Sequence, residues 1–97
     1  MTGPRDTVGF VGDTAVLQCR TNESLSSMSW SRDLTTIASS TNGVFERYPR
    51  LSLNRSADGQ FDLVINSTNS NDANIYRCAE GHSRVVSAEL VLLGKCF

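Results

Sequence analysis

The sequence predicts an all-β fold in which two sheets pack face to face, and three observations support this. Apolar and polar residues alternate in short runs along most of the chain, as they do in half-buried strands. Turn-forming dipeptides, such as Gly12-Asp13 and Asp58-Gly59, separate these runs. No stretch shows persuasive helical periodicity. At least about seven short strands at this spacing are typical of a sandwich rather than of an α/β fold.

The strands are expected in residues 14–20, 28–31, 50–53, 61–65, 75–79 and 85–93. Weaker signals predict a brief strand at residues 37–38 and an edge strand at 44–45, on either side of a polar loop. Alternation assigns one face of each main strand to the core. The residues expected to point inward are Ala15, Leu17, Cys19, Met28, Trp30, Leu51, Leu53, Phe61, Leu63, Ile65, Tyr76, Cys78, Ala88, Leu90 and Leu92.

Length and composition indicate one globular domain over residues 1–97, with a core at about 4–93 and residues 94–97 beginning a stalk or a further domain. Hydrophobic residues make up 39% of the chain and charged residues 20%, which is ordinary for a folded protein. A net charge of −1 provides no field to attract nucleic acid. No apolar run is long enough for a membrane helix. If the protein is secreted, we expect that its signal peptide has been removed and that Met1 is a start residue added for expression.

Three cysteines bear on the compartment of the protein. Cys19 and Cys78 lie within alternating apolar runs, and Cys96 lies beside the last residue. The chain has no C-x-x-C pair of the kind that binds metal, so we expect no metal and no cofactor. Two alternatives remain open from the residues alone, a reduced pair of core cysteines and a long-range disulfide. Cys96 is expected either to bridge two chains or to mark a cut at a domain boundary.

Three Asn-x-Ser/Thr sequences are candidate glycosylation sites. They begin at Asn22, Asn54 and Asn66, and all three fall in expected turns or strand ends. An Asn-, Ser- and Thr-rich chain produces one or two such sequences by chance, so this excess is mild support for an extracellular protein.

Five residues stand in a specific order across the chain. Trp30 follows Cys19 by about eleven residues, Tyr76 precedes Cys78 by two, and Asp72 precedes Tyr76 by four. This pattern resembles the immunoglobulin superfamily, and the resemblance extends over essentially the whole chain. It implies an immunoglobulin-like, two-sheet Greek-key sandwich.

The resemblance also implies roles for these residues. A disulfide between Cys19 and Cys78 would join the two sheets against the indole of Trp30. The hydroxyl of Tyr76 would turn back onto the preceding backbone corner. Asp72 would accept the guanidinium of Arg50. All of these are roles in the scaffold, not in binding.

The long interval between Cys19 and Cys78 leaves room for the extra strands of a V-type domain, in the V-set or between V-set and I-set. Residues 12–20, 49–53 and 59–65 resemble the first domains of nephrin- and kirrel-type adhesion receptors. Asn74 and Ala79 depart from that narrower pattern. Residues 92–95 lack the Phe-Gly-x-Gly bulge of antibody variable domains, so a rearranging antigen receptor is disfavoured and a V-type immune receptor of another kind remains open.

The resemblance implies an extracellular recognition module that binds a protein through the sheet built from the strands termed G, F, C and C′. Its partner would be an immunoglobulin-like domain, homophilic or heterophilic, with a homodimer possible and with no nucleic acid or small-molecule substrate. The alternative is a structural spacer domain without its own ligand. An enzyme is not expected, since His82 is the only histidine and no acid supports it. The residues predicted for the binding face are Ser29, Ser31, Ile37, Arg77, Ala79, His82, Arg84 and Glu89, with Ile75, Ser87 and Val91 also pointing outward.

Overall fold

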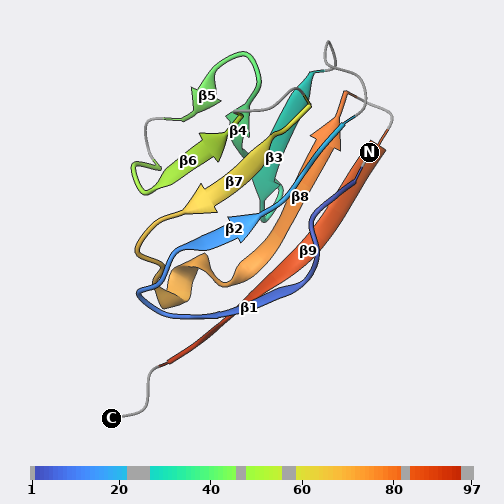
Figure 1. The fold of residues 1–97 in the computed structure, drawn as a ribbon. Helices are drawn as coiled ribbons and strands as arrows, with labels where there is room; N and C mark the ends of the chain where they lie inside the picture. The colour runs from blue at the N-terminus through green and yellow to red at the C-terminus, as the bar shows by residue number, and fades with distance from the viewer. Residues whose placement is uncertain (1, 22–26, 46–47, 56–58, 82–83, 95–97) are drawn as a thin grey trace.

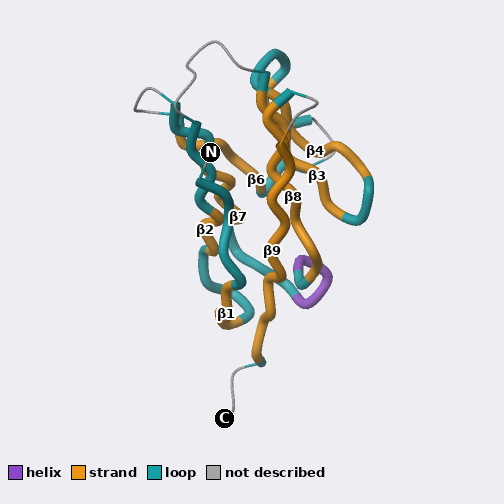
Figure 2. The backbone as a smooth tube through the Cα atoms, turned by 90° about the vertical axis from the view of Figure 1, so that its right-hand side faces the viewer, coloured by secondary structure: helices purple, strands orange, loops and turns teal. Residues whose placement is uncertain are grey.

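The computed structural model describes residues 2–21, 27–45, 48–55, 59–81 and 84–94 as two facing β-sheets (Figures 1 and 2). One sheet has six strands in the order β1-β9-β8-β3-β4-β5, and the other has three in the order β2-β7-β6. The prediction of an all-β sandwich is therefore confirmed. The strands are β1 (Thr7–Phe10), β2 (Ala15–Leu17), β3 (Met28–Arg32), β4 (Thr35–Ser39), β5 (Gly43–Val44), β6 (Leu51–Asn54), β7 (Asp62–Ile65), β8 (Asn74–Glu80) and β9 (Arg84–Leu93).

Neighbouring strands pair antiparallel, except that β1 runs parallel to β9. Neither β1 nor the 3-10 turn η1 (Ser70–Asp72) was predicted from the sequence. The expected strand at residues 14–20 is regular only in β2. Beyond it the chain stays hydrogen-bonded to the neighbouring segment, because the amide of Phe61 donates to the carbonyl of Cys19 at 2.8 Å.

The core lies between the sheets and is centred on a disulfide. Cys19 follows β2 and Cys78 lies in β8, so the bond between them joins opposite sheets. Trp30 is completely buried, and its indole N–H donates to the carbonyl of Phe61 at 2.9 Å. This bond removes the cost of burying a polar N–H without a partner. The predicted inward faces of β2, β3, β7 and β8 are buried as expected.

Ile37 corrects one prediction. It was expected on the outer face, but it is fully buried, as is its neighbour Ala38. The pairing of β3 with β4 changes register between Trp30, which pairs with Ala38, and Ser31, which pairs with Thr36. Ile37 is the extra residue of this β-bulge. A bulge breaks the two-residue alternation, and two successive side chains therefore enter the core.

Gly59 is required by a close backbone approach. Its φ is +76°, and a Cβ there would lie 2.1 Å from the carbonyl oxygen of Thr21. The amide of Thr21 also donates to the carbonyl of Gly59 at 2.9 Å, so the two segments cannot easily separate.

Gly59→Ala is expected to lower the free energy of unfolding by about 2–3 kcal/mol, from the left-handed backbone and the clash together. Gly43→Ala is the matched control, since Gly43 has φ +70° and open space around it. It should cost only about 1 kcal/mol. Urea unfolding of both variants gives the comparison, and equal losses would show that the approach to Thr21 carries no penalty.

Candidate functional site: the outer face of the six-stranded sheet

The outer face of the six-stranded sheet is organised around β8, which lies between β9 and β3 (Figure 1). Tyr76 and Cys78 of β8 point into the core, so the residues that alternate with them, Ile75, Arg77 and Ala79, point outward. The register then aligns outward residues in rows across the strands. One row is Ser29, Ala79 and Val85; the next is Ser31, Arg77 and Ser87; the third is Ile75 and Glu89. These eight residues form the outer face.

The outer face combines small side chains with a few apolar and charged ones. Ser29, Ser31 and Ala79 are half-buried among their neighbours, and their short side chains project little from the sheet. Val85 and Ile75 stand out from it, with 60% and 43% of their surface exposed. Exposed apolar groups beside small residues allow a partner to approach closely and to exclude water without the ordering of many long side chains.

Arg77 and Glu89 are the two charged residues of the outer face. Within the described part of the chain, neither has an ion-pair partner. The backbone amide of Glu89, not its side chain, donates a hydrogen bond to the carboxylate of Asp6 at 2.8 Å. No ion pair among the described residues therefore competes with an outside group for either charge.

A shallow hollow of about 200 Å³ lies at one end of this face. Hydroxyl-bearing residues line most of it, namely Ser27, Ser29, Ser39, Ser40 and Thr41, together with Met28 and Gly81. Two of the hydroxyls are used locally: Ser40 accepts from the amide of Met28, and Ser39 accepts from the amide of Asn42, each at 3.0 Å. The sequence showed Ser39–Thr41 only as a polar loop. Their position beside Ser29 depends on the pairing of β3 with β4.

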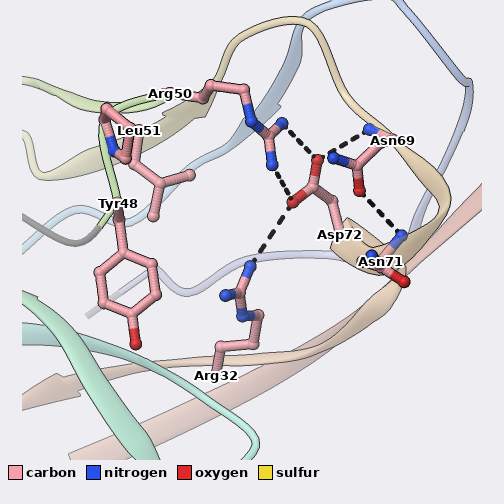
Figure 3. Close-up of a pocket in the computed structure, with 8 residues that line it drawn as sticks. Arg32, Tyr48, Arg50, Leu51, Asn69, Asn71 and Asp72 are labelled. Atoms are coloured by element: carbon pink, nitrogen blue, oxygen red, sulfur yellow. Dashed lines mark hydrogen bonds and ion pairs between the residues drawn. The ribbon is translucent and has the colours of Figure 1, made fainter.

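The opposite end of the sandwich holds an ion-pair cluster around Asp72 (Figure 3). Arg50 donates to the two carboxylate oxygens of Asp72 at 2.7 and 3.0 Å, and Arg32 lies 3.5 Å away. The amide of Asn69 donates to the same carboxylate at 2.8 Å, and the Tyr76 hydroxyl donates to the carbonyl of Asp72 at 2.7 Å. The contacts predicted for Arg50 and Tyr76 are thus present, while the contribution of Arg32 was missed.

Burial is the largest single influence on the pKa of Asp72, and it raises that value. The hydrogen bonds from Arg50 and from the amide of Asn69, with the charges of Arg50 and Arg32, outweigh it. The net result is a pKa below the usual range, so Asp72 is ionised at neutral pH. Arg50 also donates to the carbonyls of Asn66 and Ser67. Since the carboxylate and guanidinium are paired with each other, this cluster ties η1 to the start of β6 and supports the fold.

The remaining predicted residues are dispersed. Arg84 is exposed at the start of β9, opposite Glu80. Glu80 lies just beyond the strand that was expected at residues 75–79, but in the structure it ends β8 and is buried. Asn54 and Asn66 are exposed beside the three-stranded sheet. Asn22, His82 and Cys96 lie outside the described residues.

Two further features of the described residues bear on other classes of function. No group of three or more His, Cys, Asp or Glu residues there is arranged to hold a metal ion. No helix in the same part of the chain is long and apolar enough to span a membrane.

Comparison with protein families gives a match to the immunoglobulin domain over residues 5–87. The chain therefore belongs to the immunoglobulin domain family, and the Cys19–Cys78 bond is the disulfide typical of that fold. Members of this family are typically recognition modules without enzymatic activity. No curated protein matches the sequence.

Solved structures of similar fold include the first immunoglobulin domains of several proteins. The Ig1 domain of mouse SynCAM 2 has a TM-score of 0.84 and 22% identity, over 96% of this chain and 95% of that one. The first Ig domain of the mouse polymeric immunoglobulin receptor has a TM-score of 0.83 and 20% identity, over 99% and 96%. The ZIG-8 IG1 homodimer gives 0.83 and 20%, over 98% and 85%. These likenesses establish the V-type fold.

Proposed function

We propose that this chain is an extracellular recognition domain that binds another protein, an immunoglobulin-like domain, through the outer face of its six-stranded sheet. The observation that carries the proposal is the composition of this face. It presents exposed Ile75 and Val85 among small residues, beside the charges of Arg77 and Glu89. A patch of this kind fits a protein surface better than a small molecule, since it is broad and shallow.

Two further observations support the proposal. The disulfide is the kind of bond that persists in oxidising, extracellular surroundings. The structures with a similar fold include the ZIG-8 IG1 homodimer and a complex of Dpr1 IG1 with DIP-eta IG1. The proposed mechanism is burial of surface and pairing of charges, without a catalytic step. A role in adhesion or in immune recognition belongs to the same proposal, as does occupancy of the exposed Asn54 and Asn66 by glycans.

A glycan placed on the outer face tests the proposal. Ser29→Asn turns residues 29–31 into an Asn-x-Ser acceptor sequence in the middle of the face. Secreted, glycosylated protein is to be tested for binding against a panel of extracellular immunoglobulin-type domains that includes this chain itself. We expect the glycan to abolish binding that the unmodified domain shows, because it holds the partner away from the face.

The same Ser29→Asn variant made without glycosylation is the matched control, and it should bind nearly as well as the original. Glycans at the natural sites Asn54 and Asn66, beside the other sheet, should leave binding intact. Full binding by the glycosylated Ser29→Asn protein would contradict the proposal and favour a spacer domain.

A further inference from the structure

Three residues of the outer face form a compact group with opposite charges on either side of an apolar side chain. Ile75 and Arg77 are two residues apart on β8, which places them about 7 Å apart on the same side of the sheet. Glu89 of β9 lies directly opposite Ile75 in the antiparallel register, where Cβ atoms are about 5 Å apart. Ile75 thus occupies the corner between Arg77 and Glu89. This group is called the charge-flanked patch below.

The charge-flanked patch is complementary to itself. In a dimer with two-fold symmetry, a residue that contacts a second residue of the partner receives the same contact in return. Consider two copies packed with their six-stranded sheets face to face. One two-fold axis then lies in the interface, parallel to these sheets, and is the perpendicular bisector of the line from Arg77 to Glu89. Rotation about it brings Arg77 of each copy over Glu89 of the other. Ile75 lies close to that axis, so the two isoleucines meet between the two ion pairs.

The neighbours of the patch leave room for this arrangement. Arg77 is flanked by Ser31 on β3 and by Ser87 on β9, so short side chains stand on both sides of the guanidinium. The carboxylate of a partner can therefore reach it. Glu89 is exposed, and within the described residues no ion pair inside the protein competes for either charge.

We infer that the occupant of the outer face is a second copy of this chain, paired through the charge-flanked patch. This inference rests on the proposed function and names its partner. Like charges brought together at such a contact suppress association, and opposite charges fix the register of the two copies.

Charge exchange between the two positions tests the inference. The affinity of self-association is to be measured by sedimentation velocity up to about 1 mM, in a Cys96→Ser background that excludes covalent dimers. Arg77→Glu alone and Glu89→Arg alone should each weaken the dimer by about tenfold or more, because each places two pairs of like charges in contact. Ile75→Thr, which keeps a β-branched residue in the strand, should also weaken it.

Two combinations should restore association to nearly the original affinity. The first is the double variant Arg77→Glu/Glu89→Arg, which keeps the net charge of the original chain. The second is an equimolar mixture of the two single variants, which pair with each other because the charges are then opposite at both contacts. Unchanged circular dichroism and melting temperature show that each variant is folded.

The possible failures separate this inference from the proposed function. A strict monomer at about 1 mM overturns self-pairing, while a different partner can still use the face. A dimer that neither single variant weakens overturns the inference as well. If the glycan introduced by Ser29→Asn also leaves that dimer intact, the two copies pair through another surface, and the proposed function is then judged by its own binding test with other partners. Weakening without rescue rejects the reciprocal contact of Arg77 with Glu89.

Discussion

Replacing Cys19 and Cys78 together with alanine is expected to lower the free energy of unfolding by about 4 kcal/mol. The disulfide closes a loop between residues 59 positions apart, so its loss restores much conformational freedom to the unfolded chain. It also removes a buried contact between the sheets, in the same core as the indole of Trp30. For a domain of this size, such a loss is a large part of the total stability.

The measurement is urea unfolding in a Cys96→Ser background, so that no thiol can exchange with the bond. Chemical reduction of that background protein is the matched comparison and should cause a loss of similar size. A loss below about 1 kcal/mol would mean that packing alone holds the sheets together, and that the disulfide is dispensable for the fold.

Asp72→Asn is expected to cost about 3 kcal/mol at neutral pH. The substitution leaves the volume nearly unchanged but removes the negative charge that Arg50 and Arg32 face. It also weakens the bond from the amide of Asn69. This loss lies at the lower end of the range for breaking a buried ion pair, because Arg50 is 39% exposed and water partly solvates it.

The same carboxylate gives the stability a defined pH dependence. The pKa of Asp72 is lower in the folded protein than in the unfolded chain, where it is about 3.9. Its contribution is therefore complete above about pH 4–5 and is lost as the pH falls through the folded value. The gap in stability between the original protein and Asp72→Asn should narrow on acidification from pH 5 to about pH 2.

Asp33→Asn is the matched control for this pair of measurements. Asp33 is exposed in the turn between β3 and β4, with φ 50°, a conformation that Asn also accepts. It should change stability by less than about 0.5 kcal/mol. A gap for Asp72→Asn that stays constant down to pH 2 would show that the charge of Asp72 does not stabilise the fold.

Much of the fold could be predicted from the alternation of apolar and polar residues, because a strand with one buried side has apolar residues at every second position. Trp30, Leu63 and Tyr76 were assigned inward on this ground, and all three are completely buried. Ile37 was not foreseeable in this way, since a bulge is set by how β4 pairs with β3 and not by its own sequence.

Short elements and contacts between distant segments were also not predicted from the sequence. The 3-10 turn at Ser70–Asp72 is too short to show periodicity, although Asn69 and Asp72 form a capping box whose spacing is visible in the sequence. Arg32 approaches Asp72 only because β3 pairs with β8. Arg77 and Glu89 could each be assigned to the outer face, but their positions on either side of Ile75 follow from the register of β8 and β9.

The most direct test of the proposed recognition face is amide hydrogen exchange of the domain, alone and in complex with the immunoglobulin-type domain that it binds, its own second copy included. Binding through the outer face should slow exchange in β3, β8 and β9 and leave exchange in β2, β6 and β7 unchanged. Protection confined to β2, β6 and β7 would contradict it, because those strands form the other sheet.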